Sequence, residues 1–127
     1  MSSSPQFAAT PRVGIAQVSV ANPNRDGTGT LATVLTAGAS GTRIDYVAIK
    51  ATGSTSAGMI RLYVHDGSNA RLLSEDEVPE LTVSAASKAH ESLVELAGGI
   101  VIPTGYSLRA STEVGETFNI FAIGGDL

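Results

Sequence analysis

Short segments of alternating apolar and polar residues, separated by turn-forming residues, run along the whole chain and constrain its fold more than any other feature. The clearest segment is residues 59–66, MIRLYVHD. Successive side chains of a β-strand point to opposite faces, so this alternation predicts a strand. Asp66 and Gly67 then predict a tight hairpin turn into a partner strand at residues 70–75. In the predicted strand, Ile60, Leu62 and Val64 face one side, and Met59, Arg61, Tyr63 and His65 face the other, polar side.

The same reasoning predicts strands in most of the remaining chain. The stretch from Glu77 to Ala97 is open to two interpretations: a helix that ends at Gly98, or two strands at residues 80–85 and 90–97. We favour strands because Pro79 and the threonine and valine residues suit them. The other predicted strands are residues 13–21, 30–37, 42–52, 105–112 and 117–123, and the last two are expected to form a hairpin.

Residues 1–12 are predicted to form an extended N-terminal arm, because Pro5 and Pro11 disfavour a helix. Hydrophobic residues make up 43% of the chain, which argues against disorder, and residues 13–127 are enough for one domain with one core. Eight or nine short strands with turn signals between them are typical of two packed sheets. We therefore predict an all-β fold, a single jelly-roll-like β-sandwich of about eight antiparallel strands. An immunoglobulin-like arrangement is the alternative.

The last predicted strand is apolar on both faces. Phe118, Ile120 and Ala122 point one way, while Phe121 and Ile123 point the other. Two explanations remain open at this stage. The strand is either central in its sheet and covered by a loop on its second face, or it turns one face to the core and the other to a neighbouring subunit.

The composition argues against several classes of function. The net charge is −4 and the six arginines are scattered, whereas a protein that binds nucleic acid needs clustered cations. There are no cysteines, which removes disulfides and thiolate chemistry. The first residues, MSSSPQFAATPRVG, do not resemble a secretory signal, and no apolar run is long enough to cross a membrane. We therefore expect synthesis in the cytoplasm, with neither nucleic acid nor a membrane as partner.

No pattern of residues predicts catalysis or a cofactor. A zinc site would need both histidines, His65 and His90, together with a carboxylate, and nothing places them close together. The acidic run from Glu75 to Glu80 lacks the spacing of a calcium loop and is interpreted as a solvated loop. The chain has neither a nucleophile elbow nor a phosphate-binding loop. With no tryptophan, it is also short of the aromatic residues that line most sugar-binding clefts.

Two stretches, residues 58–80 and 100–127, carry a series of short motifs in a fixed order. An Asp-Gly turn is followed by a pair of leucines and a glutamate, then by an apolar turn with proline and glycine, and finally by a Gly-Gly-Asp-Leu ending. This series resembles small β-sandwich proteins encoded among the structural genes of tailed bacteriophages, and the likeness covers residues 42–127. The matching residues are Asp66, Gly67, Leu72, Leu73, Glu75, Ile102, Pro103, Gly105, Leu108, Gly124, Gly125, Asp126 and Leu127.

The resemblance implies a non-enzymatic structural protein of the virion. The first role that it implies is that of a head decoration (cement) protein. Such a protein binds the major capsid protein on the outside of the capsid, as a homotrimer on a local three-fold axis. The alternative is a tail or baseplate component, which could include a carbohydrate-binding domain for host recognition. The residues expected to contact other subunits or the capsid are Pro5, Phe7, Pro11, Phe118, Phe121, Ile123 and Leu127.

Overall fold

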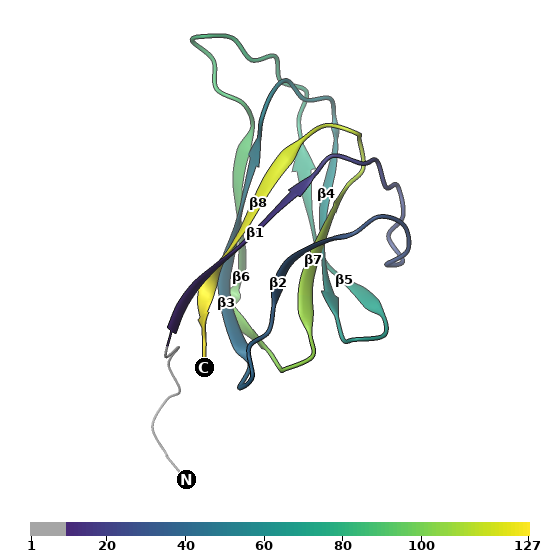
Figure 1. Ribbon diagram of the computed structural model, residues 1–127. Coiled ribbons are helices and arrows are strands. Elements are labelled where there is room, and N and C mark those ends of the chain that lie inside the picture. Colours follow the sequence, from purple (N-terminus) through teal and green to yellow (C-terminus); the bar gives the residue numbers. More distant parts are fainter. Residues whose placement is uncertain (1–9) are drawn as a thin grey trace.

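The computed structural model describes residues 10–127, which form eight β-strands and no helix (Figure 1). Apolar residues alternate with polar ones along most strands, and turn-forming residues follow their ends. The all-β prediction is confirmed. The strands are β1 (Thr10–Val18), β2 (Ala32–Thr36), β3 (Thr42–Ala51), β4 (Gly58–His65), β5 (Ala70–Val78), β6 (Glu91–Ile102), β7 (Ser107–Thr112) and β8 (Phe118–Asp126).

The strands pair in a nested order. β1 pairs with β8, β2 with β7, β3 with β6 and β4 with β5, and each pair is antiparallel. Pairing of β8 with β3 and of β7 with β4 joins these pairs into two four-stranded sheets. Sheet A has the order β1-β8-β3-β6, and sheet B has the order β2-β7-β4-β5. A nested set of eight strands wrapped into two sheets is a jelly roll, which confirms the predicted architecture.

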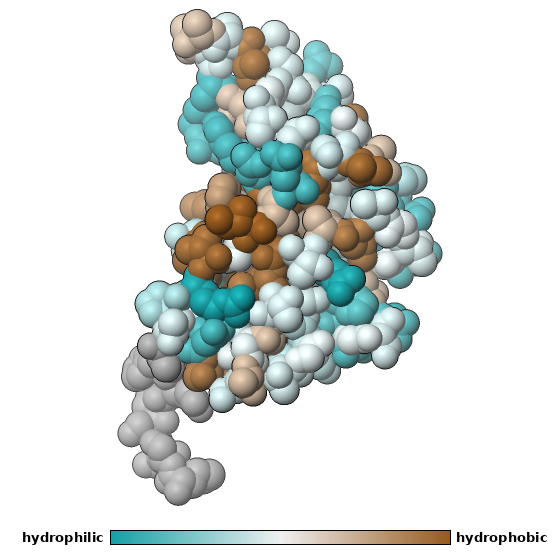
Figure 2. All heavy atoms as spheres, viewed as in Figure 1, coloured by the Kyte–Doolittle hydropathy of each residue, from teal (hydrophilic) through white to brown (hydrophobic). Residues whose placement is uncertain are grey.

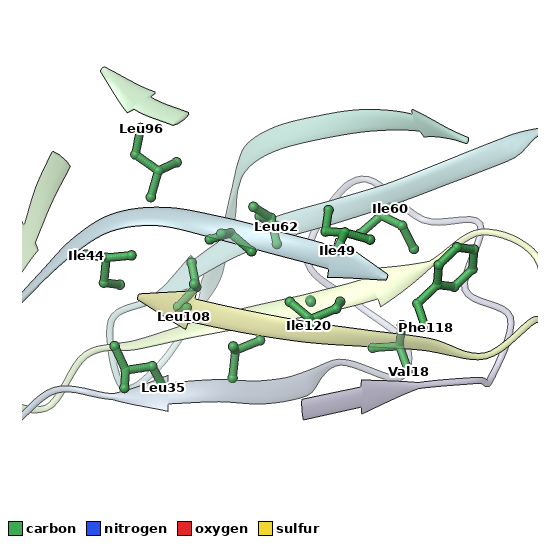
Figure 3. Packing of buried hydrophobic residues seen from close by; sticks show 14 of the residues in the cluster. Val18, Leu35, Ile44, Ile49, Ile60, Leu62, Leu96, Leu108, Phe118 and Ile120 are labelled. Carbon is green, nitrogen blue, oxygen red and sulfur yellow. The ribbon is translucent and has the colours of Figure 1, made fainter. Parts of the chain in front are cut away.

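The hydrophobic core fills the space between the two sheets (Figure 3). Strands of both sheets point alternate apolar side chains into it, and each fully buried isoleucine or leucine contributes about 1.5–3 kcal/mol to folding. The inward residues of β8 are those that the alternation predicts, including Phe118 and Ile120. The best-buried aliphatic side chains are Ile44, Val47, Ile49 and Ile120 from sheet A and Ile60, Leu62 and Leu108 from sheet B.

The predicted hairpin between the last two strands is wrong. β7 lies in sheet B between β2 and β4, whereas β8 lies in sheet A between β1 and β3. The chain leaves β7 still bonded to β4, because the amide of Glu113 donates to the carbonyl oxygen of Met59 at 2.9 Å. The Thr112 hydroxyl and the Glu116 amide then both donate to the Val114 carbonyl, which turns the chain towards the opposite sheet.

The segment from residue 77 to residue 97 contains one strand end, a loop and the start of another strand. β5 continues to Val78, and β6 begins at Glu91 and runs through Gly98 without a helix. The predicted strand at 80–85 is wrong, because Leu81 forms only an isolated bridge with Thr55. The intervening loop extends beyond the sheets at the top of Figure 1. Small residues dominate its tip, so it has few apolar side chains with which to join a sheet.

β1 begins at Thr10, so Pro11 and Arg12 lie in a strand, although the sequence places them in the arm. Proline is tolerated there because β1 is an edge strand that pairs only with β8. Pro5 and Phe7 lie outside the described residues, and the arm at residues 1–9 stays a prediction. Residues 10–127 contain no helix that could span a membrane.

Candidate functional site

The outer face of sheet A carries a patch of apolar side chains. The strand register places Ile15, Phe121, Ala48 and Leu93 in one row across β1, β8, β3 and β6. The next row contains Val13, Ile123, Tyr46 and Glu95. Residues directly opposite each other on neighbouring strands lie on the same face and touch. The sheet A patch is therefore defined as Val13, Ile15, Tyr46, Leu93, Phe121 and Ile123.

Solvent reaches much of this patch. Val13 is 58% exposed, Ile15 65% and Leu93 64%, while Phe121 and Ile123 between them are half-buried. Figure 2 shows hydrophobic residues gathered over β1 and β8, with hydrophilic residues above and below. An antiparallel sheet that faces water normally places polar residues on that face. An apolar row across four strands is instead typical of a surface that another molecule covers.

Polar residues border the patch at both ends of the strands. On one side, the side-chain amide of Gln17 donates to the Asn119 side-chain oxygen at 2.9 Å. On the other side, the Arg43 guanidinium donates to Asp45 at 2.8 Å. An apolar centre with a polar rim is the usual anatomy of a protein–protein interface.

The loop at residues 21–31 covers part of the outer face of sheet B, over Arg61 and Tyr63 of β4 (Figure 1). The Tyr63 hydroxyl donates to the Asn24 carbonyl at 2.9 Å, and the Asn22 side chain donates to the Thr28 and Thr30 carbonyls. Tyr63 and Arg61 are fully buried beneath this loop. The two side chains point to the face that the alternation predicts, but this face is buried at their positions.

Arg61 is held by a shared carboxylate. One oxygen of Glu75 accepts hydrogen bonds from Arg61 at 2.9 Å and from Arg25 of the covering loop at 2.7 Å. Hydrogen bonds from Arg25 and Arg61 lower the pKa of Glu75, so it is ionised at neutral pH. Sequence reasoning missed this pair of hydrogen bonds, because Arg25 lies among turn-forming residues and no local sequence pattern links it to Glu75.

The acidic run and the histidines have separate places in the structure. Glu75, Asp76 and Glu77 lie in β5, so the prediction of a solvated acidic loop is wrong for them. His65 accepts the amide hydrogen of Gly67 at Nδ1. His90 directly precedes β6, and its Nε2 lies 3.9 Å from Oδ2 of Asp76. Within residues 10–127, no three histidine, aspartate or glutamate side chains gather as metal ligands.

The motifs near residues 66 and 124 have structural roles. The Asp66 carboxylate accepts the amides of Ser68 and Asn69, and the hairpin turns at Gly67 and Ser68, one residue later than predicted. Gly124 lies against β3 so closely that a Cβ atom there would be 1.8 Å from the Arg43 carbonyl oxygen. Only glycine fits at such an approach of two backbones.

Asp126, the last residue of β8, links β8 to the neighbouring strands. Its Oδ1 accepts the Thr42 hydroxyl at 2.7 Å and the Arg12 guanidinium at 3.0 Å. The hydrogen bond from Thr42 and then that from Arg12 lower the pKa of Asp126. Arg12 also donates to the Thr36 carbonyl, so the interaction ties together β1, β2, β3 and β8. Asp66, Gly124 and Asp126 of the motifs therefore help to hold the fold together.

The structure describes five of the seven expected contact residues. Phe121 and Ile123 lie on the sheet A patch, Pro11 is exposed on β1 beside it, and Leu127 is half-buried after β8. Phe118 was expected to contact another subunit or the capsid, but it is 1% exposed, because the alternation of β8 turns it into the core. Tyr46 and Leu93, which sequence reasoning missed, join the patch because β3 and β6 lie next to β8 in register.

No family model matches the chain, and no curated protein matches it in sequence. Among solved structures, it is similar to a pentameric capsid protein isolated from metagenomic phage sequences, with 11% identity and a TM-score of 0.45 over 90% of this chain. The chain spans 61% of that protein.

Two further solved structures are similar over most of this chain. One holds the CBM22-1 and GH10 modules of Clostridium thermocellum xylanase 10B, with 13% identity, a TM-score of 0.41 and coverage of 91% of this chain and 25% of that chain. The other is the T13 IBDV viral particle, with 11% identity, a TM-score of 0.39 and coverage of 99% and 35%. The TM-scores of all three structures are too low for the likeness to bear on function.

Proposed function

We propose that the chain is a non-enzymatic structural protein of a tailed-phage virion, a head decoration protein that binds the outside of the capsid through the sheet A patch. The observation that carries this proposal is the exposed apolar row of Ile15, Phe121 and Leu93. Soluble proteins rarely leave such a row uncovered, so it supports a protein partner. The resemblance of residues 42–127 to phage structural proteins supports the major capsid protein as that partner.

The proposal that the protein is not an enzyme is supported by the roles of three of its carboxylates. Asp66 holds a turn, Glu75 binds Arg25 of the loop over sheet B, and Asp126 joins β8 to β1 and β3. Each of these three carboxylates therefore has a structural role. A rigid sandwich with one apolar outer face suits a protein that strengthens a shell by contact.

Binding to empty capsids of the phage that encodes the chain tests this proposal directly. Ile15→Ser and Leu93→Ser change side chains that are largely exposed, so the melting temperature should change little. If the patch is buried on the capsid, each variant loses about 1–2 kcal/mol of apolar burial, which weakens binding roughly 5- to 30-fold in a co-sedimentation assay.

Leu73→Ser is the matched control, because Leu73 is an exposed apolar side chain on β5 of sheet B, away from the patch. It should bind capsids like the wild type. The proposal is wrong if the wild-type protein does not bind capsids, or if Ile15→Ser binds as tightly as Leu73→Ser. Saturable, sugar-specific binding of the wild type on a glycan array would favour the tail or baseplate alternative.

We also propose a homotrimer, which the resemblance supports because decoration subunits occupy local three-fold axes. Light scattering of the isolated protein measures its mass directly. Phe121 lies in the row that the capsid is proposed to cover, so Phe121→Ser should weaken capsid binding and leave the mass of the isolated protein unchanged. A wild-type protein that stays monomeric at high concentration contradicts the trimer.

A further inference from the structure

The chain has only two lysines, and both line the same hollow on sheet A. This open hollow of about 600 Å³ lies at the β6 side of the patch. Its apolar lining comes from Ala48, Leu93 and Phe121, which are neighbours in one row of the sheet. Lys50, Lys88 and Glu91 supply its charged lining.

The charged groups of the hollow are held in place by short-range contacts. The Lys50 ammonium donates to the Ala89 carbonyl at 2.9 Å, and Lys50 lies opposite Glu91 on the neighbouring strand. Lys88 and Glu91 form an ion pair, and Lys88 followed by Lys50 lowers the pKa of Glu91, which is therefore ionised. The rim thus has a net positive charge in a protein whose net charge is −4.

This inference rests on the proposed structural role and names the chemistry of the partner. We propose that the hollow receives a protein segment in which an apolar side chain is followed by a carboxylate. The apolar side chain packs on Leu93 and Phe121, and the carboxylate meets the ammonium groups of Lys50 and Lys88. Glu91 repels a second carboxylate on its side, so it sets the direction in which the segment lies.

The hollow is less suited to a sugar. Sugar-binding sites present aromatic faces to the ring, and Phe121 is the aromatic side chain that lines this hollow. An acidic sugar would still be attracted by the two ammonium groups, so it belongs among the probes of the test.

Charge variants of the rim should act in opposite directions on one binding measurement. Lys88→Glu should weaken binding to phage capsids about threefold to fivefold at low salt, and Glu91→Lys should strengthen it by a similar factor. Both side chains are at least half exposed, so both variants should fold. Arg71→Glu is the matched control on sheet B and should bind like the wild type.

A peptide titration tests the inference without a capsid. In NMR spectra of the full ¹⁵N-labelled chain, acetyl-Leu-Glu-Leu-Glu-amide should shift the amide signals of Ala48, Leu93 and Phe121, with Kd about 1 mM or weaker. Acetyl-Leu-Lys-Leu-Lys-amide should not shift them, and Lys88→Glu should weaken the response to the acidic peptide.

The inference is overturned if both peptides cause the same shifts, if the shifts lie elsewhere, or if glucuronate alone causes them. Equal capsid binding by Lys88→Glu, Glu91→Lys and the wild type would also overturn it. If the wild-type protein does not bind capsids but binds the acidic peptide at the hollow, only the decoration role is contradicted.

Discussion

Replacing Gly124 by alanine should destabilise the protein severely, although the change adds a single methyl group. The added Cβ atom would lie 1.8 Å from the Arg43 carbonyl oxygen, whereas such atoms essentially never approach within 3.0 Å in proteins. β3 and β8 would have to separate locally by about 1.2 Å or more. A shift of that size breaks backbone hydrogen bonds between the two strands in the middle of sheet A.

The expected decrease in the free energy of unfolding can be estimated from these effects. One or two lost hydrogen bonds cost about 0.5–1.5 kcal/mol each, and overpacking of a dense region costs about 1–3 kcal/mol more. The sum is about 3 kcal/mol, which for a domain of this size lowers the melting temperature by about 10–15 °C. Thermal unfolding followed by circular dichroism measures this shift, and urea unfolding gives the free energy independently.

Gly53→Ala is the matched control, because no atom lies within 4 Å of the Cβ position there and its backbone does not need a positive φ. It should leave the melting temperature unchanged or raise it slightly, since alanine restricts the unfolded chain. If Gly124→Ala melts within about 2 °C of Gly53→Ala, the close approach of β8 to β3 is not a constraint on the sequence. The structural explanation of the Gly-Gly-Asp-Leu ending would then be wrong.

Two further predictions concern single side-chain hydrogen bonds. Because Thr42 and Arg12 lower the pKa of Asp126, its contribution to stability is present near neutral pH and is lost as the pH falls below about 4. Urea unfolding at several pH values should therefore show that the free energy of unfolding falls less on acidification for Asp126→Asn than for the wild type. If the free energies of both proteins fall equally with pH, this prediction is contradicted. Tyr63→Phe removes the hydrogen bond to Asn24 and should cost about 1 kcal/mol, whereas Tyr46→Phe on the open face should cost less than about 0.5 kcal/mol.

Alternation along the sequence was sufficient to predict most of the strands, although the strand predicted at residues 80–85 is absent. It predicted that Phe118 and Phe121 point to opposite faces of β8, and the structure places Phe118 in the core and Phe121 on the outer face of sheet A. The sequence left two explanations for the second apolar face. The outer row between Ile15 and Leu93 is largely exposed, which favours the explanation based on a neighbouring subunit.

The cover of sheet B could not be predicted, because its contacts join residues far apart in the sequence. Arg61 looks like a surface residue in an alternating strand, and only the return of residues 21–31 across β4 buries it. The local sequence pattern also could not predict that β7 and β8 lie in different sheets. Their connection has the length of a hairpin turn, but the hydrogen bonds of Thr112 and Glu116 to Val114 direct it to the opposite sheet.

The nested strand pairing has a consequence for how the protein folds. β4 and β5 are joined by a short turn and can pair early, whereas β1 and β8 bring Thr10 to Asp126 from opposite ends of the described chain. Such non-local pairings are slow, on the order of milliseconds to seconds, because the loop entropy is lost before the contacts form. We therefore expect pulsed hydrogen exchange during refolding to protect β4 and β5 before β1.

The sheet A patch takes residues from β1, β8, β3 and β6, so it exists only after this outermost pair has closed. A chain that is only partly folded, without the pairing of β1 with β8, cannot present the row from Ile15 to Leu93. Association through this face would thus select finished subunits and leave incomplete ones in solution, with no need for a separate checkpoint.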